Sequence, residues 1–154
     1  MIKVLFVCLG NICRSPMAEF VFKDMLSQQG IGSQFEVASA GTSAEEAGNP
    51  VHRGTREKLA EHKIACSGKR ARKIVFGDYS AYDYIIGMEQ RNIASMLRFF
   101  GADPNCKLKR LLDFSSCPRD IADPWYTGNF EKTYQDILEG CTAFLQYIRA
   151  KEKF

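Results

Sequence analysis

The stretch "IKVLFVCLGNICRSPMAE", residues 2 to 19, decides the fold and holds the most unusual chemistry of the chain. Its first part, Ile2 to Val7, is a nearly continuous run of β-branched, aliphatic and aromatic residues. Such a run is typical of a strand buried on both faces of a parallel sheet. Ser15 and Pro16 then predict an N-cap and a first-turn proline, so we expect a helix from about residue 16 to a stop at Gly30.

Strand and helix patterns alternate along the rest of the chain. We expect strands over 35–39, 84–88 and 108–112, and helices from Asn49-Pro50 to about His62, over 89–100, and for about 20 residues after the cap Asn129. Alternation of this kind implies crossover units and a parallel sheet. The prediction is an α/β protein: a single doubly wound domain over residues 1–154, with a four-stranded parallel sheet, helices on both faces and flavodoxin-like topology.

Composition narrows the class of protein. The chain has 154 residues, of which 45% are hydrophobic and 25% charged, as in a globular domain. A net charge of +3 is too small to indicate a nucleic-acid binder, and the basic run Lys69 to Lys73 is expected to be a solvated edge. No stretch approaches the ~20 apolar residues of a membrane span, and the first residues do not fit a signal peptide. We therefore expect a cytoplasmic protein without membrane insertion.

The six cysteines do not indicate a disulfide framework, because a chain of this length and hydrophobicity does not need one. Neither CxxC nor HExxH occurs, and His52 and His62 have no partners at ligand spacing. The sequence therefore predicts no metal site. Most of the cysteines are expected to be small buried hydrophobic residues, and Cys8 is the one whose surroundings differ.

Residues 8 to 15 lead from the carboxyl end of a strand into a helix N-terminus, where backbone amides and the helix dipole favour an anion. Gly10 and Asn11 tolerate the left-handed backbone that turns amides inward. Arg14 could grip two phosphate oxygens at once. The same surroundings favour the thiolate form of Cys8, which is a nucleophile. The loop therefore predicts a phosphate-cradling active site, against the alternative of a simple cysteine-containing turn.

Phosphoryl transfer also needs a proton for the leaving oxygen. The loop after Leu112 contains Asp120 and Asp123, and Asp123 precedes Pro124, Trp125 and Tyr126. A turn-forming Asp-Pro with exposed aromatics is the simpler interpretation. The position after the fourth strand favours Asp123 as a catalytic acid.

These residues together resemble the low-molecular-weight protein tyrosine phosphatase family. The resemblance rests on VCLGNICRSPMAE at 7 to 19, SAGTS at 39 to 43, GNP at 48 to 50 and ADPWY at 122 to 126. It implies an enzyme in which Cys8 becomes phosphorylated, Arg14 clamps the phosphate, and Asp123 protonates the leaving group and then activates water. The expected substrates are tyrosine-phosphorylated proteins or peptides, with no metal and no cofactor.

The resemblance also assigns supporting residues. It implies that the phosphate-binding loop consists of Leu9, Gly10, Asn11, Ile12, Cys13 and Arg14. Asn11 is expected to hold the shape of the loop, and Ser15 to assist Cys8. Glu45, Trp125 and Tyr126 are expected in the wall of the substrate pocket. The chain is expected to be a monomer or a weak homodimer.

Two features of the chain lead to hypotheses of their own. Many relatives carry an aromatic residue where this chain has Glu45, and the pair Glu45 and Glu46 would favour substrates with basic flanking residues. Lys69 stands where bacterial relatives often have histidine, so the resemblance does not predict which contacts support the loop at this position. Cys13 is either a space-filling residue or the partner of Cys8 in a disulfide that protects the nucleophile under oxidation.

Two other functions remain open at this stage. A thiol-dependent arsenate reductase would share the fold and a similar loop, but it needs two further cysteines placed together. Ten residues, which include a presumed strand, separate Cys106 from Cys117, so that relay is poorly supported. A flavodoxin-like module that binds a phosphate-bearing cofactor would explain neither the cysteine nor the arginine of the loop.

Overall fold

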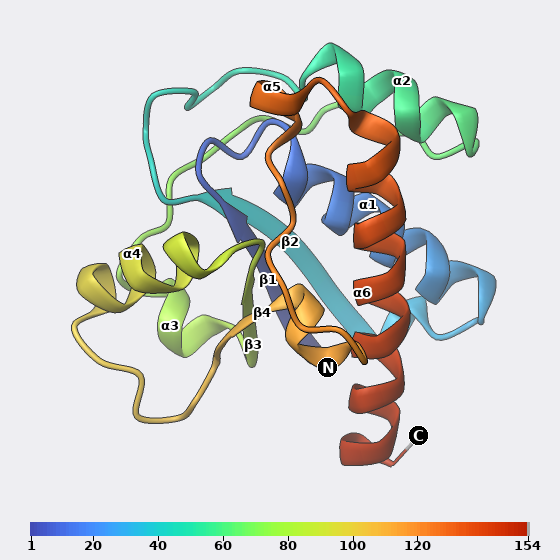
Figure 1. Ribbon diagram of the computed structural model, residues 1–154. Coiled ribbons are helices and arrows are strands. Elements are labelled where there is room, and N and C mark those ends of the chain that lie inside the picture. Colours follow the sequence, from blue (N-terminus) through green and yellow to red (C-terminus); the bar gives the residue numbers. More distant parts are fainter. Residues whose placement is uncertain (154) are drawn as a thin grey trace.

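The computed structural model describes residues 1–153 and contains one parallel sheet. Its strands are β1 (Ile2–Cys8), β2 (Phe35–Gly41), β3 (Tyr84–Gly87) and β4 (Leu108–Arg110), in the order β2-β1-β3-β4. Figure 1 shows the sheet between two layers of helices. The predicted α/β architecture with a four-stranded parallel sheet is confirmed.

Each face of the sheet has its own apolar cluster. On one face, Phe6 packs with residues of α1 (Arg14–Gln28) and α6 (Phe130–Glu152). On the other face, Leu5 and Val7 pack with residues of α4 (Gln90–Phe100). Alternate residues of β1 therefore point into different clusters, which is why the strand reads as a continuous apolar run rather than an alternating one.

The sheet's carboxyl edge carries the loop after β1 together with α2 (Arg53–Glu61) and α5 (Pro124–Thr127), as Figure 1 shows. The N-terminus and the last turn of α6 (Phe130–Glu152) lie toward the opposite edge. The remaining short elements are η1 (Gly32–Gln34), α3 (Asp78–Ala81) and η2 (Leu111–Phe114). Within the described residues, no helix is long and apolar enough to cross a membrane.

The fourth strand is shorter than the sequence predicts. Leu111 and Leu112, expected to end the strand, instead begin the 3-10 turn η2 and are fully buried in the cluster that includes α6. The sequence also gave no signal for α3, which has only four residues. Apolar residues alone did not distinguish an extended segment from a tight helical turn here.

The start of α1 corrects the prediction for Ser15. The helix begins at Arg14, its N-cap is Cys13, and no side chain caps it. The Ser15 side chain does not cap the helix because its hydroxyl lies 3.0 Å from Cys8 Sγ and accepts a hydrogen bond from Asn11. The side chain that looked like a cap is therefore used inside the loop.

The start of α2 also differs from the prediction. The cap is His52, whose Nδ1 accepts a hydrogen bond from the Gly54 N–H at 3.0 Å. Asn49 instead accepts the Ala71 N–H through its carbonyl, and Pro50 pairs with Arg70 in an isolated antiparallel bridge. Residues 49–50 are held by this neighbouring segment, so the helix begins later.

Candidate active site

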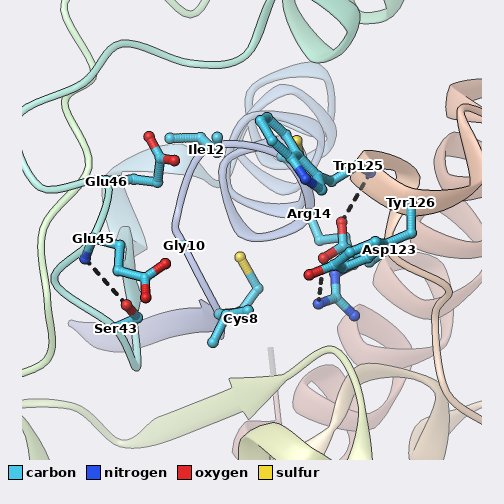
Figure 2. Close-up of a pocket in the computed structure, with 12 residues that line it drawn as sticks. Cys8, Gly10, Ile12, Arg14, Ser43, Glu45, Glu46, Asp123, Trp125 and Tyr126 are labelled. Carbon is cyan, nitrogen blue, oxygen red and sulfur yellow. Dashed lines mark hydrogen bonds and ion pairs between the residues drawn. The ribbon is translucent and has the colours of Figure 1, made fainter.

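The floor of the site is Cys8, the last residue of β1, with 3% of its surface exposed. Its Sγ lies 3.0 Å from Ser15 Oγ and accepts the Ser15 backbone N–H at 3.4 Å. The loop from Gly10 to Ile12 curves past this sulfur before α1 begins, as Figure 2 shows. The sulfur therefore lies against the Ser15 hydroxyl and accepts one backbone N–H at the base of the loop.

Asn11 holds the loop from inside. It is buried and has a φ of 60°, in the left-handed region that asparagine tolerates. Its Nδ2 donates to Ser15 Oγ at 2.8 Å and Ser39 Oγ at 3.0 Å, and its Oδ1 accepts the Arg72 N–H at 3.0 Å. These contacts satisfy the side chain fully and tie the loop to two distant segments, β2 and residues 70–74.

The backbone of the loop is braced by its neighbours. The Thr42 N–H donates to the Cys8 carbonyl at 2.9 Å, and the Ser43 N–H donates to the Leu9 carbonyl at 3.0 Å. On the other side, the His52 N–H donates to the Ile12 carbonyl at 2.8 Å. The loop carbonyls therefore point outward to these partners, which leaves the inner side of the loop for other groups.

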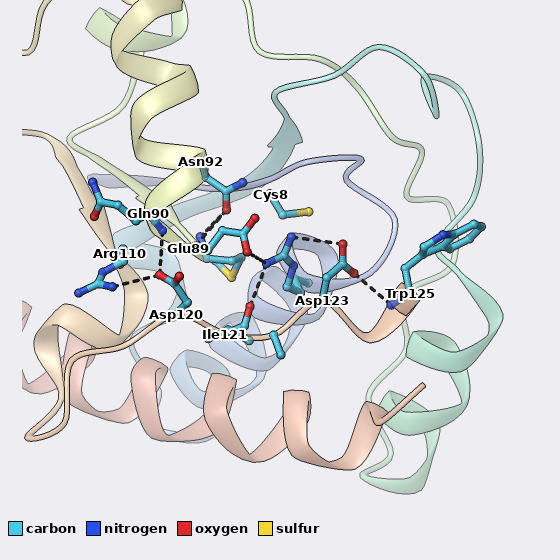
Figure 3. A network of polar contacts seen from close by, with 12 residues as sticks. Cys8, Glu89, Gln90, Asn92, Arg110, Asp120, Ile121, Asp123 and Trp125 are labelled. Carbon is cyan, nitrogen blue, oxygen red and sulfur yellow. Dashed lines mark hydrogen bonds and ion pairs between the residues drawn. The ribbon is translucent and has the colours of Figure 1, made fainter. Parts of the chain in front are cut away.

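Arg14 is almost completely buried at the base of the site, with 1% of its surface exposed. Its guanidinium has three acceptors, which Figure 3 labels: the Ile121 carbonyl at 2.9 Å, Glu89 at 3.1 Å and Asp123 at 3.4 Å. Burial disfavours the charge, but Cys8, Asp123 and Glu89 together raise the pKa of Arg14. Arg14 is therefore a permanent cation beside Cys8.

Asp123 comes into the site from the far end of the chain, 109 residues after Arg14. It caps α5, with its Oδ1 accepting the Trp125 N–H at 3.0 Å while Oδ2 faces Arg14. The predicted alternative of an Asp-Pro turn is therefore part of the observed structure, and the same carboxylate also faces the pocket.

A cavity of about 130 Å³ joins these groups. Its lining consists of Cys8, Leu9, Gly10, Ile12, Cys13, Arg14, Ser43, Glu45, Glu46, Asp123, Trp125 and Tyr126. Every predicted site residue is in this lining except Asn11 and Ser15, which support the loop from behind. Trp125 and Tyr126 line the cavity and are 57% and 78% exposed.

The support of the loop includes residues that sequence reasoning missed. Glu19 is buried, accepts a hydrogen bond from Ser39 Oγ at 2.6 Å and lies 3.6 Å from Lys69 Nζ. Lys69 also donates to the Ser39 carbonyl at 2.8 Å. Its side chain is only 13% exposed, so the expectation of a solvated edge over 69–73 is wrong for this residue. The motif SAGTS, which contains Ser39, was the available signal.

Burial and the nearby Glu19 have opposite effects on the pKa of Lys69. Burial lowers the pKa of Lys69, and Glu19 counteracts part of that effect. Farther along the same segment, Arg72 forms an ion pair with Asp78 at 3.0 Å. Two cations of the basic run, Lys69 and Arg72, are therefore paired, while Arg70 and Lys73 are exposed as expected.

Only half of the six cysteines are buried, which corrects the expectation that most are. Cys8, Cys13 and Cys141 are buried, Cys66 is intermediate, and Cys106 and Cys117 are exposed. Burial and the nearby Cys8 raise the pKa of Cys13 to about 12, so Cys13 is a thiol at neutral pH. Both loop thiols are free, and a Cys8–Cys13 disulfide under oxidation stays a prediction.

No group of His, Cys, Asp and Glu side chains in residues 1–153 is arranged to hold a metal ion. Fold and pocket together define an α/β protein with a cysteine and arginine pocket at the carboxyl edge of its sheet. The family model for low molecular weight phosphotyrosine protein phosphatase matches residues 3–153. The chain belongs to this family, and the prediction that it is an enzyme of this class is confirmed.

Named relatives agree with this assignment. The chain is 45% identical to the low molecular weight protein-tyrosine-phosphatase YfkJ of Bacillus subtilis (strain 168), over 99% of each chain. The crystal structure of YfkJ from Bacillus subtilis superposes with a TM-score of 0.95, covering 98% of this chain and 96% of that one. The low molecular weight protein tyrosine phosphatase SP-PTP from Streptococcus pyogenes gives a TM-score of 0.88 at 38% identity, covering 99% and 97%.

Proposed function

We propose that this chain hydrolyses phosphotyrosine in proteins and peptides through a phosphocysteine intermediate on Cys8. The observation that carries the proposal is the meeting of three groups in one pocket: the Cys8 sulfur, the buried Arg14 cation and the Asp123 carboxylate. A nucleophile, an anion clamp and a proton donor are what phosphoryl transfer by a cysteine requires.

In the first step, the Cys8 thiolate attacks phosphorus, the S–P bond forms and the P–O bond to tyrosine breaks. The departing phenolate oxygen takes its proton from Asp123. Arg14 and the inner amides of the loop stabilise the charge on the equatorial oxygens. A bound phosphate competes with Asp123 for Arg14, and this competition leaves the carboxyl of Asp123 available for proton transfer.

In the second step, a water molecule attacks the phosphocysteine and gives a proton to Asp123. The S–P bond breaks, inorganic phosphate leaves, and the Cys8 thiolate returns with Ser15 beside it. The proton that Asp123 gave away in the first step is thus restored. No step in this cycle needs a metal, so EDTA is expected to leave the rate unchanged.

The experiment measures turnover of p-nitrophenyl phosphate and of a tyrosine phosphopeptide. Cys8→Ser is expected to abolish turnover. Asp123→Asn is expected to lower kcat by about 10²–10⁴, the usual contribution of a general acid, with the larger loss on the poorer leaving group. The matched control is Asp120→Asn, which removes a carboxylate of the same loop that pairs with Arg110 instead. Equal losses in the two variants would reject the assignment of Asp123.

Arsenate reduction is the alternative that the same assay series tests. Besides Cys8 and Cys13, no cysteine of the described chain lines the pocket. A relay of oxidation to further cysteines therefore has no support at the pocket. We expect phosphate release without a thiol reductant, and thiol-dependent arsenate reduction without phosphate release would overturn the proposal. A cytoplasmic location and a monomeric or weakly dimeric state belong to the same proposal.

A further inference from the structure

A second cavity, of about 370 Å³, lies beside the Cys8 pocket. The two share Leu9, Arg14, Asp123 and Tyr126 in their walls, so they adjoin each other at the catalytic groups. The Cys8 pocket, with about 130 Å³, has room for little more than the phosphorylated side chain itself. The residues on either side of a phosphotyrosine must therefore lie over surfaces next to it.

One of these surfaces is acidic. Glu45 and Glu46 line the Cys8 pocket from the loop that follows β2. Glu46 accepts a hydrogen bond from Asn49 Nδ2 at 2.6 Å, and its Cγ packs 3.3 Å from where a Cβ on Gly10 would be. Figure 2 shows the Glu45 carboxylate directed toward the pocket. Within residues 1–153, neither carboxylate forms an ion pair with a cation.

The second cavity contains one unpaired cation among the charged groups of its described lining. Its three carboxylates, labelled in Figure 3, already contact arginines: Glu89 and Asp123 share Arg14, and Asp120 pairs with Arg110, which also pairs with Asp113. Arg91, an exposed residue of the first turn of α4, also lines this cavity. In the described part of the chain Arg91 forms no ion pair with a carboxylate, so it is the cation of this lining that is free to meet an acidic residue of a substrate.

Topology places these two charges on opposite sides of Cys8. The acidic loop follows β2, and α4 follows β3, while β1 with Cys8 lies between these two strands in the sheet. Adjacent strands are ~4.8 Å apart, so the ends of β2 and β3 lie ~10 Å apart. A peptide rises ~3.3 Å per residue, so residues within about three positions of a phosphotyrosine reach both sides.

We propose that the substrate groove is polarised, and that it selects phosphotyrosine segments with a basic residue on the side facing Glu45 and Glu46 and an acidic residue on the side facing Arg91. This inference rests on the proposed function. It extends the hypothesis drawn from Glu45 and Glu46 alone, because Arg91 makes the order of charges matter and not only their sum. Each exposed charge pair is expected to change kcat/KM by about 1.5- to 5-fold.

The test compares two phosphotyrosine peptides of identical composition, one with lysines before and glutamates after the phosphotyrosine, the other with the order reversed. At low ionic strength, kcat/KM is expected to differ about fivefold or more between the two orders, and the ratio is expected to shrink toward one at 0.5 M salt. Equal values for both orders at low salt would overturn the proposal. Because the ratio is taken within one enzyme, a general loss of activity does not affect it.

Variants that remove charge test whether both surfaces contribute to the ratio of kcat/KM between the two peptides. Glu45→Gln with Glu46→Gln, and separately Arg91→Gln, are each expected to reduce the ratio at least about twofold. Matched controls are Glu36→Gln, an exposed residue near the start of β2, and Arg98→Gln, an exposed residue two turns farther along α4. Both controls are expected to keep the ratio of the unmodified enzyme.

The outcomes separate the two proposals. A ratio that responds to only one of the two surfaces would reject a polarised groove. If the unmodified enzyme hydrolyses neither peptide nor p-nitrophenyl phosphate, the proposed function itself is wrong. Hydrolysis of both peptides at one rate removes only the polarity and leaves the function standing.

Discussion

Gly41 shows how closely one residue can control the candidate site. It ends β2 beside the Cys8 loop, and a Cβ at this position would lie 2.7 Å from the Leu9 carbonyl oxygen and 3.2 Å from the Asn11 nitrogen. Both contacts are to backbone, which cannot rotate away as a flexible side chain could. The absence of a side chain at residue 41 therefore allows the loop its observed position.

We predict that Gly41→Ala lowers kcat/KM for p-nitrophenyl phosphate by about 10²-fold, because a displacement near 1 Å in a catalytic loop costs roughly this much. The matched control is Gly77→Ala, since no heavy atom lies within 4 Å of the added Cβ at that position. Steady-state kinetics on both variants make the comparison. Unchanged activity in Gly41→Ala would show that the loop has more freedom than these contacts allow.

At the scale of single residues, the loop itself could be predicted but its support could not. Cys8, Arg14 and Ser15 are close in sequence, and a strand before them and a helix after them fix their surroundings. Glu19 looked like an ordinary helix residue, and Lys69 like part of an exposed basic run. Their burial depends on contacts of Glu19 in α1 with Ser39 of β2 and with Lys69, which no local pattern encodes.

His52 links secondary-structure elements around the mouth of the pocket. Its imidazole caps α2, stacks on Phe130 with ring centroids 5.4 Å apart, and meets the edge of Trp125 at 5.5 Å. Its backbone N–H also donates to the Ile12 carbonyl in the loop that follows Cys8. One side chain thus connects the start of α2, the start of α6 and the aromatic wall of the pocket.

We predict that His52→Ala lowers the free energy of unfolding by about 1 kcal/mol, the usual effect of losing an N-cap, and changes the emission of Trp125. The fluorescence is specific because Trp125 is the one tryptophan of the chain. His62→Ala is the matched control: His62 stacks on Tyr134 at 4.0 Å, and this variant is expected to leave the emission as it is. The same emission spectrum in all three proteins would contradict a contact between His52 and Trp125 in solution.

Gly140 shows that helix propensity alone does not decide which residue suits the interior of a helix. From the sequence, Gly140 is a weak point in the last helix, since alanine is about 1 kcal/mol more favourable in a helix. In the structure, a Cβ at Gly140 would lie 2.5 Å from Leu111 Cγ. The glycine lets η2 pack closely on α6, so the apparent weakness is a requirement of tertiary packing. Helix periodicity predicted α6 itself, because that pattern is local.

Over the whole molecule, the topology was predictable because alternating strand and helix patterns leave few arrangements for a parallel sheet. The position of Asp123 beside Arg14 was predictable only from the fourth strand's carboxyl end and from the family resemblance. Lys69 and the cap of α2 were not, since each depends on contacts between segments that are distant in sequence. Such contacts exist only in the folded chain.

Because the groups of the candidate site come together only in the folded chain, we predict that bound phosphate stabilises the whole fold. The site combines Cys8 and Arg14 with Asp123, which only folding brings together. Phosphate should therefore bind the folded chain and not the unfolded one, which raises the free energy of unfolding by about 2.7 kcal/mol at 100 times its Kd. Denaturant unfolding in phosphate, compared with chloride at equal ionic strength, measures this increase.

Variants of two arginines test where phosphate binds to produce this increase in the free energy of unfolding. Arg14→Lys is expected to remove most of the increase, because a lysine cannot offer the two parallel donors of a guanidinium. Arg98→Lys makes the same change on the exposed side of α4 and is expected to keep the increase in full. The increase is compared within each variant, so a lower starting stability of Arg14→Lys does not affect the result. An equal increase in both variants would mean that phosphate stabilises the chain somewhere other than the Cys8 pocket.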